Sequence, residues 1–416
     1  MPVDWAKFAR DTLNIGGITF VEVVDITTSS GGLNAQIMRL NIRTEGRDSF
    51  SHSVVVKRTR EGNIEASTAL GTTREVFFFN HFAPIVDPLN EFTPKIFFAA
   101  IEGDGSKTVV MEDLQRQHGV HAGYFFGAHS CLNWGKDLPA LTRHFPNVTA
   151  RAITMKAFVA AARLHGRFLL DSALLDKEYL RAADWVHGTG KEGFLRVANF
   201  AIEAWKRVCA KHLPSGEAGE AVVRIDDRIV RFMRNAIDKI DFEEYAAMWR
   251  RPLPEGKLDD TAGKKKLWTM VHGDFHPANF MVVDPHHRDT DFSLTLLDWE
   301  ACGVGCGPQD LGQFIISHCT AEMWRSFASE AIAAYRSTLM DVLTQLRGAD
   351  LAEQLCPSLE CIHADYIEGG LCRWAWLLPV CMEVCPPAAA QYFHDQVLSF
   401  MLDHGVDPES LGMMRP

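Results

Sequence analysis

The sequence predicts an α+β fold with a small mixed N-terminal lobe and a larger, mainly helical C-terminal lobe. Two observations predict this fold class. The first ~110 residues alternate short runs rich in β-branched residues with one intervening helical segment, the order expected of α+β architecture. After Asp113, apolar residues recur at helical spacing over long stretches. We therefore predict that the two lobes span residues 1–113 and 114–416.

The N-terminal elements follow from their apolar periodicity and from the turn residues between them. Residues 4–13 are spaced as a short amphipathic helix, and Phe77, Phe78 and Phe82 give a later segment an apolar helical face. The first two strands flank a turn that holds Gly31 and Gly32, which indicates a hairpin. The predicted strands are Val21–Ile26, Gln36–Ile42, Ser53–Lys57, Lys95–Ala100 and Thr108–Met111, and the second helix is Ala66–Phe82.

The C-terminal lobe is predicted as helices interrupted by one short β region. The clearest helical spacings cover Ala150–Leu170, Glu192–His212 and Ala221–Ile240. We expect Trp268–His272 and Phe280–Val283 to form a β pair, followed by a strand over Leu294–Asp298. From Asp310 onward the chain is again mostly helical.

Composition excludes several classes of protein. The chain has 416 residues, of which 47% are hydrophobic, enough for a sizeable core. Its net charge of −11 argues against a nucleic-acid partner. The most apolar late stretch, Leu371–Cys385, is interrupted by Arg373, Pro379 and Glu383, so we expect no membrane insertion. The 10 cysteines contain no CxxC pair and lie in apolar segments, which favours free thiols in a reducing, cytoplasmic compartment. The sequence does not indicate an oligomeric state.

An ordered series of polar residues carries the chemical hypothesis. Lys57 ends a strand, Glu75 lies in the next helix, and Asp274 and Asn279 lie in one polar run ahead of Asp298. Transfer of a phosphoryl group needs a cation and backbone amides for the triphosphate, an Asp for the attacking hydroxyl, and hard oxygen ligands for metal ions. The spacing Asp-x-x-x-x-Asn is that of a kinase catalytic loop. Each residue alone has an ordinary structural explanation, so the hypothesis depends on the whole series.

These motifs resemble the aminoglycoside phosphotransferase and choline kinase superfamily, whose fold is protein-kinase-like and two-lobed. Within that superfamily, the N-terminal motifs are most similar to the ecdysteroid kinase-like branch, also called CHK kinase-like. The resemblance runs over about residues 20–315 as an ordered series. Its motifs are Gly31-Gly32-Leu33-Asn34, Val110-Met111-Glu112-Asp113-Leu114, Leu164-His165-Gly166, His272-Gly273-Asp274 with Asn279, Leu297-Asp298-Trp299-Glu300, and Asp310-Leu311.

The resemblance implies an ATP- and Mg²⁺-dependent phosphotransferase with an alcohol group as acceptor. By position, Asp274 is the catalytic base, and Asn279 and Asp298 are the magnesium ligands. Lys57 is the phosphate lysine and Glu75 its ion-pair partner. The remaining nucleotide-binding residues implied are Gly31 and Gly32 in the hairpin and Met111, Glu112, Asp113 and Leu114 in the adenine hinge.

The motifs depart from those of protein kinases at two places, and the loss of an arginine at one of them favours a small-molecule acceptor. Asp298-Trp299-Glu300 replaces Asp-Phe-Gly, and Gly273 replaces the Arg that pairs with a phosphorylated activation loop. We therefore expect a constitutive small-molecule kinase that phosphorylates a hydroxyl of a metabolite or xenobiotic. Two alternatives stay open, namely a choline or ethanolamine kinase and a nucleotide-binding pseudokinase that acts as a scaffold.

The acceptor is open at the level of sequence. Tyr366, Trp374 and Trp376 lie near two glutamates and could form a cage for a quaternary ammonium, although their helical spacing favours a buried helix. The aromatic run 124–126 with Trp134 could instead line a sterol-sized pocket. Choline-like, aminoglycoside-like and steroid-like acceptors all fit. The GxGxxG pattern that begins at Gly188 follows no convincing strand, so we predict a helix-linking loop there.

Overall fold

The structure is a computed structural model that describes residues 4–27, 35–213, 223–250, 266–284 and 292–416. The chain divides into two compact units, each described by itself below. Unit 1 combines Met1–His121 with Phe280–Ala301, and unit 2 combines Ala122–Asn279 with Cys302–Pro416. Unit 1 is mainly β and unit 2 mainly α, which confirms the predicted α+β fold class. The boundary at residue 113 stays a prediction.

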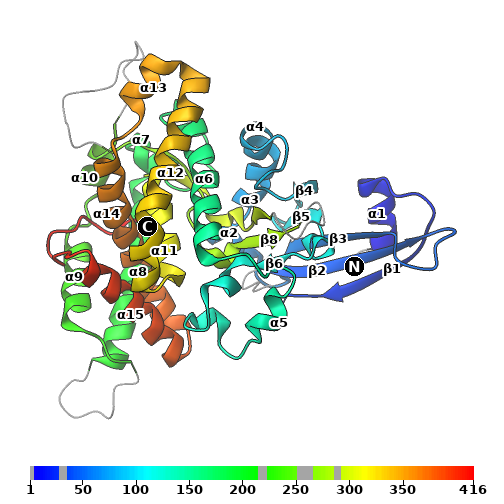
Figure 1. The fold of residues 1–416 in the computed structure, drawn as a ribbon, viewed down its shortest axis with the longest axis horizontal. Helices are drawn as coiled ribbons and strands as arrows, with labels where there is room; N and C mark the ends of the chain where they lie inside the picture. The colour runs from blue at the N-terminus through cyan, green and yellow to red at the C-terminus, as the bar shows by residue number, and fades with distance from the viewer. Residues whose placement is uncertain (1–3, 28–34, 214–222, 251–265, 285–291) are drawn as a thin grey trace. The chain divides into compact units, whose positions relative to one another are not determined.

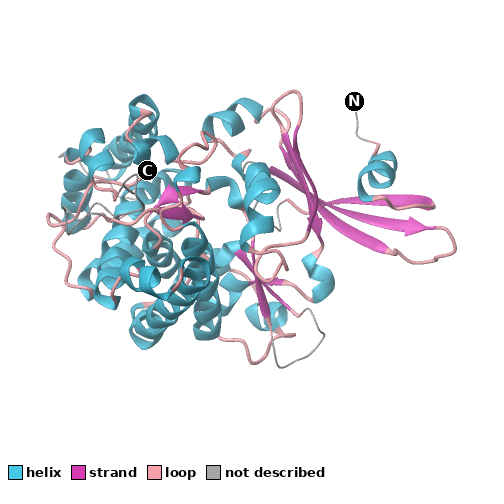
Figure 2. Cartoon of the chain, turned by 90° about the horizontal axis from the view of Figure 1, so that it is seen from above, coloured by secondary structure: helices cyan, strands magenta, loops and turns pink. Residues whose placement is uncertain are grey.

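The main sheet of unit 1 is antiparallel, with its strands in the order β1-β2-β3-β5-β4. These strands lie side by side in Figure 2, where they are drawn in magenta. The sheet brings Lys57 of β3 opposite Val109 of β5. All five strands were predicted, with ends that differ by up to three residues. Their bounds are β1 Ile18–Asp25, β2 Ala35–Thr44, β3 His52–Thr59, β4 Ile96–Ile101 and β5 Lys107–Glu112.

The predicted first helix is α1 (Trp5–Leu13), labelled in Figure 1. Asp4 caps its N-terminus by accepting a hydrogen bond from the Lys7 amide, and Asn14 ends it in the left-handed conformation. Trp5 and Phe8 of this helix pack on the buried side chains of the sheet. Removing this apolar face from water stabilises the sheet that carries Lys57.

The single helix predicted over Ala66–Phe82 is wrong, because the segment is broken. Gly71 has a φ of +68°, which only glycine adopts readily, and it ends the first piece. A π-helical turn over Phe78–Phe82 follows, and its phenylalanines are buried. This break leaves Glu75 in a short helix separate from the first piece. The pieces are α2 Ile64–Leu70, α3 Arg74–Phe77, η1 Phe78–Phe82 and α4 Ala83–Val86.

The predicted β pair between Trp268–His272 and Phe280–Val283 is also wrong. The first segment is β7 (Thr269–Val271), and it pairs with β10 (Gly303–Gly305) in unit 2. The second is β8 (Phe280–Val283), which lies between β6 (Val120–His121) and β9 (Ser293–Leu296) in unit 1. The residues between β7 and β8 form a loop and not a hairpin turn. The Asp310 side chain of α11 binds the backbone of this loop, as described below.

Unit 2 is built of helices, and two of them approach closely. A Cβ at Gly312 of α11 would lie 2.4 Å from the Tyr366 carbonyl oxygen, and one at Gly370 of α14 would lie 2.8 Å from the Gly312 Cα. Only glycine permits this distance between the backbones. The three helices predicted before residue 241 are observed as α6, α8 and α9, the last shorter than predicted. The helices are α5 Leu138–Thr142, α6 Ala150–Phe168, α7 Ala183–His187, α8 Lys191–His212, α9 Asp227–Asp238, α10 Phe242–Ala247, α11 Pro308–His318, α12 Ala321–Arg347, α13 Ala349–Leu355, α14 Leu359–Val384 and α15 Pro387–Asp403.

Short 3₁₀ helices complete the two units, and three of them adjoin predicted site residues. They are η2 Leu114–Gln117, η3 Ala122–Phe126, η4 Cys131–Asn133, η5 Ser172–Leu174, η6 Pro277–Asn279 and η7 Trp299–Ala301. Within the parts of the chain that the structure describes, no helix combines the length and the apolar character needed to cross a bilayer.

Candidate active site

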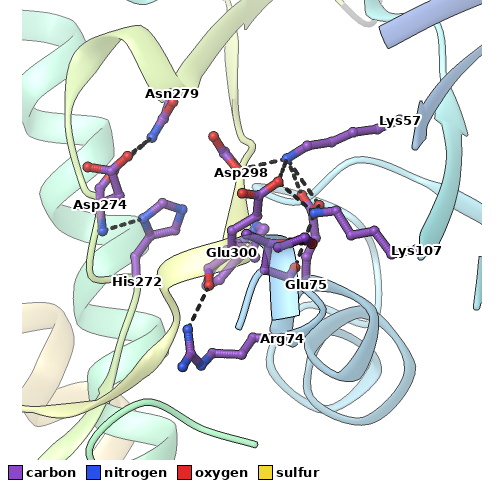
Figure 3. Close-up of polar contacts among 12 residues, drawn as sticks. Lys57, Arg74, Glu75, Lys107, His272, Asp274, Asn279, Asp298 and Glu300 are labelled. Atoms are coloured by element: carbon purple, nitrogen blue, oxygen red, sulfur yellow. Dashed lines mark hydrogen bonds and ion pairs between the residues drawn. The ribbon is translucent and has the colours of Figure 1, made fainter. Parts of the chain in front are cut away.

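Unit 1 gathers three of the predicted site residues into one charged cluster (Figure 3). The Lys57 Nζ lies 3.0 Å from Oε2 of Glu75 and 2.7 Å from Oδ1 of Asp298. Lys57 and Glu75 are buried, whereas the Asp298 side chain is 40% exposed. The strand β3, the helix α3 and the turn after β9 therefore bring together a cation and two carboxylates that lie far apart in sequence.

The same cluster contains two charged residues that the sequence reasoning did not assign. Glu300 lies 2.9 Å from the Lys57 Nζ through its Oε1. Lys107, at the first position of β5, lies 2.6 Å from the same Glu300 oxygen and 2.5 Å from Glu75. Glu300 appeared in the sequence only as a departure from a known motif. Lys107 gave no signal, because a lysine at the start of a strand is ordinarily solvated.

Asp298 has an unusual backbone conformation in the chain segment that follows β9. Strand β9 ends at Leu296 and not at Asp298 as predicted, and Asp298 has a φ of +64°. Residues other than glycine seldom adopt this conformation, and when they do they concentrate at functional sites. The next residue, Trp299, is fully buried and stacks on Phe78 with ring centroids 3.5 Å apart. This stacking anchors the turn on the π-helical segment beside Glu75.

The charges in this cluster shift one another's protonation equilibria. Burial alone would raise the pKa of Glu75, but attraction by Lys107 and then by Lys57 lowers that pKa to about 2. Burial disfavours the charged form of Lys57, yet Asp298, Glu75 and Glu300 together raise its pKa well above the ordinary value. Burial, with repulsion from the other carboxylates, raises the pKa of Asp298 despite the attraction of Lys57. At neutral pH the cluster is therefore ionised at Glu75 and Lys57.

The cluster also has the donor set of a site for a hard divalent cation. One carboxylate oxygen from each of Glu75, Asp298 and Glu300 lies within 4.8 Å of the others. Carboxylate oxygens are the ligands that Mg²⁺ takes from proteins. The residues present thus fit a magnesium ion in chemical type, with the partly exposed Asp298 as its most accessible ligand.

Unit 2 carries the predicted catalytic loop, and the Asp310 side chain of α11 forms hydrogen bonds with its backbone. Its carboxylate accepts hydrogen bonds from the backbone amides of His272 at 2.8 Å and Gly273 at 3.2 Å. Asp310 is fully buried, and it also lies 3.4 Å from Nε2 of His165. Asp310 therefore braces this loop, and His165 has a structural role beside it.

Asp274 follows this brace and is held through both carboxylate oxygens. Gln313 Nε2 donates to Oδ1 at 2.9 Å, and Asn279 Nδ2 donates to Oδ2 at 3.1 Å (Figure 3). His276 Nε2 lies 3.4 Å from the same Oδ2. Burial opposes ionisation of Asp274, but interactions with His276, His272 and Arg373 lower its pKa well below the usual range. The carboxylate is therefore ionised and oriented at neutral pH.

Asn279 contacts Asp274 through its amide nitrogen and not through its amide oxygen. Because its Nδ2 donates to the carboxylate and to the backbone carbonyl of Asp274, Oδ1 is the end of the amide that can bind a cation. Unit 2 therefore brings together Asp274 and Asn279, and unit 1 brings together Lys57, Glu75 and Asp298. Sequence reasoning missed Gln313, which has no motif and reaches the loop from α11.

A buried arginine of α14 contacts the catalytic loop from a second side. The Arg373 guanidinium donates to the Gly273 carbonyl oxygen at 2.9 Å and is 4% exposed. Burial, and then repulsion by Arg181, lower the pKa of Arg373 to about 9, so it remains charged at neutral pH. The loop thus has a positive charge beside it although Gly273 replaces the arginine of the protein-kinase motif.

The predicted hinge residues lie at the end of β5 and the start of η2. Met111 pairs with Val55 and Ile96 in the sheet, and the Glu112 amide donates to the Lys95 carbonyl. Asp113 caps η2 through the Gln115 amide and pairs with Arg39 at 2.9 Å. The Asp113 side chain therefore has a structural role. Leu114, the last hinge residue, is buried. Gly31 and Gly32 lie outside the described residues.

The aromatic residues of α14 do not form the cage considered for a quaternary ammonium. Tyr366 and Trp374 are buried in the helix, as the helical spacing predicted. The two glutamates are bound elsewhere, Glu368 to Lys266 at 2.8 Å and Glu383 to Arg207 at 2.5 Å. The GxGxxG run joins α7 to α8: Gly188 to Gly190 lie between the two helices, as the predicted loop required, whereas Lys191 to Gly193 form the first turn of α8.

Comparison with known proteins agrees with the motifs. Residues 173–348 match the model of the ecdysteroid kinase-like family, which confirms the predicted resemblance. The matched range includes Asp274, Asn279 and Asp298, and begins after Lys57. No curated protein sequence matches the chain.

The chain is similar to several solved structures, including the two that follow. A choline kinase from Cryptosporidium parvum Iowa II is 12% identical, covers 96% of this chain and 94% of its own, and has a TM-score of 0.51. An ethanolamine kinase from Plasmodium vivax is 10% identical, covers 96% of this chain and 86% of its own, and has a TM-score of 0.47. The first of these likenesses identifies the fold as kinase-like.

Proposed function

We propose that this protein is a small-molecule kinase that transfers the γ-phosphoryl group of ATP to a hydroxyl group of a metabolite or xenobiotic. The match to the ecdysteroid kinase-like family supports the class of small-molecule kinase. The observation that carries the choice of ATP and Mg²⁺ is the unit 1 cluster. There a buried ammonium, Lys57, lies between Glu75 and the partly exposed Asp298.

In this proposal each predicted site residue has one part in the chemistry. Lys57 offsets the negative charge of the phosphates, and Asp298 and Asn279 hold the magnesium ion. Bound Mg²⁺ supplies positive charge to the phosphate oxygens. Met111, Glu112, Asp113 and Leu114 contact adenine through backbone groups, and the amides of Gly31 and Gly32 contact the phosphates. Positioning and electrostatic stabilisation account for most of the catalysis of such a transfer.

Asp274 orients the acceptor hydroxyl and receives its proton. The hydroxyl oxygen forms a bond to the γ-phosphorus while the bond from that phosphorus to the β–γ bridging oxygen breaks. The products are a phosphate ester and ADP, and the hydroxyl proton passes to the Asp274 carboxylate. The low pKa of Asp274 keeps the carboxylate ionised, so it is ready to accept a hydrogen bond from the hydroxyl before transfer.

The test is the substitution Asp274→Asn, which keeps the shape of the side chain and removes the base. Turnover should fall by about 10²–10⁴-fold, the usual contribution of a positioned base. Affinity for Mg-ATP should change little, since Asp274 faces the acceptor. The measurements are phosphate-ester formation across a panel of hydroxylated compounds, by mass spectrometry, and Mg-ATP affinity by calorimetry. Asp341→Asn, on the exposed side of α12, is the matched control and should behave as wild type.

The same experiment separates the enzyme from the two alternatives. Equal turnover by wild type and Asp274→Asn would remove Asp274 from the mechanism. Tight Mg-ATP binding without product across the whole panel would favour a pseudokinase scaffold. Turnover confined to choline and ethanolamine would identify the narrower kinase, although the ion pairs of Glu368 and Glu383 leave that alternative without a specific observation in its favour.

A further inference from the structure

The second lysine of the unit 1 cluster has no part in the mechanism proposed above. Lys107 is 1% exposed, and its ammonium has three acceptors in the cluster. They are Glu75 Oε2 at 2.5 Å, Glu300 Oε1 at 2.6 Å and the Thr72 carbonyl oxygen at 3.1 Å. An ammonium has three N–H donors, so this geometry uses all of them. Lys107 is therefore fixed in place, and Figure 3 shows its side chain directed at Glu75 and Glu300.

Lys107 and Lys57 share the same carboxylate oxygens. Oε2 of Glu75 lies 3.0 Å from the Lys57 Nζ, and Oε1 of Glu300 lies 2.9 Å from it. Lys57 has the further partner Asp298, which Lys107 does not contact. The cluster thus holds three carboxyl groups and two amino groups, a formal net charge of −1. Lys107 is also the stronger of the two cations in lowering the pKa of Glu75.

We propose that Lys107 is a positioning residue for phosphoryl transfer, which neutralises Glu75 and Glu300 so that Lys57 can turn to the phosphates. The inference rests on the proposed function, since it assigns a role in binding Mg-ATP. Lys107 acts through the two glutamates and is not itself a ligand of the nucleotide.

The physical reason lies in what Lys57 must give up when a nucleotide binds. To contact phosphate oxygens, its ammonium must weaken its bonds to the carboxylates. Glu75 is 1% exposed, and a buried carboxylate left without a cation is strongly destabilising. Because Lys107 remains bound to Glu75 and Glu300, both keep a positive partner throughout. Without Lys107, Lys57 would face three carboxylates alone and would be held there.

The test compares three lysine-to-methionine variants that each remove the charged ammonium group and keep most of the apolar length of the side chain. Lys107→Met should weaken Mg-ATP binding by about tenfold or more, the effect expected when a buried charged group loses its partner. Lys57→Met should weaken it at least as much. Lys266→Met is the matched control, since Lys266 also pairs with two carboxylates, Asp365 and Glu368, but in unit 2. It should bind Mg-ATP as wild type does.

A compensating substitution distinguishes positioning from mere structural support. Lys107→Met with Glu300→Gln removes one charge of each sign and restores the net charge of the cluster. The double variant should bind Mg-ATP more tightly than the product of the two single losses predicts. Dissociation constants are measured by calorimetry and the melting temperature is recorded for each variant.

Two results would overturn the inference while leaving the proposed function intact. One is a Lys107→Met protein that melts at a lower temperature but binds Mg-ATP as tightly as wild type. The other, decisive if Lys107→Met alone does not fold, is a folded double variant in which Mg-ATP binding is as weak as in Lys57→Met. Failure of wild type to bind Mg-ATP would instead overturn the proposed function itself, and the inference with it.

Discussion

Glu75, like Glu300, contacts both lysines of the unit 1 cluster, and its ionisation should be visible in the stability of the protein. Its pKa is lowered in the folded state from 4.5 to about 2, by Lys107 first and then Lys57, against the effect of burial. A group whose pKa is depressed on folding stabilises the folded state above its unfolded pKa. That stabilisation is lost as the pH falls through the folded value. The sensitive window therefore lies between about pH 4.5 and pH 2.

The substitution Glu75→Gln should lower the free energy of unfolding by about 3 kcal/mol at neutral pH, the equivalent of this pKa shift. At pH 3 the difference between variant and wild type should shrink to roughly half of that or less. Urea titrations at pH 7 and pH 3 measure it. Glu330→Gln, in the exposed ion pair with Arg151, is the control and should change stability by about 1 kcal/mol or less. A Glu75→Gln deficit that stays constant between pH 7 and pH 3 would contradict the assigned pKa.

Individual site residues differ in how far the sequence could predict them. Lys57, Glu75 and Asp298 were predicted because their order along the chain matches a known chemical series, and unit 1 does bring them together. Lys107 and Gln313 could not be predicted in this way. Each contacts its partner across more than 30 residues of sequence, and neither belongs to a motif with a fixed spacing. Only the fold reveals such contacts.

At the scale of elements, α14 supports the catalytic loop through Arg373. The guanidinium donates to the Gly273 carbonyl, and its carbon lies 4.9 Å from the centre of the Trp376 ring on the same helix. A hydrogen bond from a charged donor contributes about 1.5–3 kcal/mol. Because Gly273 immediately precedes Asp274, we expect this bond to fix the position of the base as well as the loop.

The substitution Arg373→Met should therefore reduce turnover by about tenfold or more, the equivalent of losing such a bond. KM for ATP should change much less, because the effect is on Asp274. Steady-state kinetics with a cognate acceptor separate kcat from KM. Arg347→Met is a matched control, since Arg347 also donates to a backbone carbonyl of unit 2, that of Leu169, away from the loop. Equal losses of activity in the two variants would indicate general destabilisation and count against a role in positioning.

The elements themselves were largely predictable, and the exceptions have physical causes. Apolar periodicity located the five strands of the main sheet and the helices α6, α8 and α9. It failed over Ala66–Phe82, where Gly71 ends a helix that the phenylalanine spacing alone would continue. It failed again for the partners of β7, because Asp310 accepts from the backbone amides after that strand and makes a loop where proximity in sequence suggested a hairpin.

At the scale of the whole molecule, the chain returns to unit 1 between the two segments that form unit 2. Contacts assign Phe280–Ala301 to unit 1, so Asp298 and Glu300 join Lys57 while Asp274 belongs to unit 2. No change in composition marks this return in the sequence. The order of motifs could therefore predict which residues form the site, but not which compact unit holds each of them.

Binding of Mg-ATP should stabilise the whole protein, and Asp298 should control this effect. A ligand that binds only the folded state stabilises it by about 2.7 kcal/mol at a concentration 100 times its dissociation constant. Asp298→Ala removes the most accessible of the carboxylates that fit a magnesium ion. The variant should fold without nucleotide, since Asp298 is partly exposed, but it should lose most of the rise in melting temperature that Mg-ATP produces in wild type. Thermal unfolding with and without Mg-ATP measures this rise, with Asp350→Ala on the surface of α13 as the control. A variant stabilised by Mg-ATP as fully as wild type would show that Asp298 does not bind the metal.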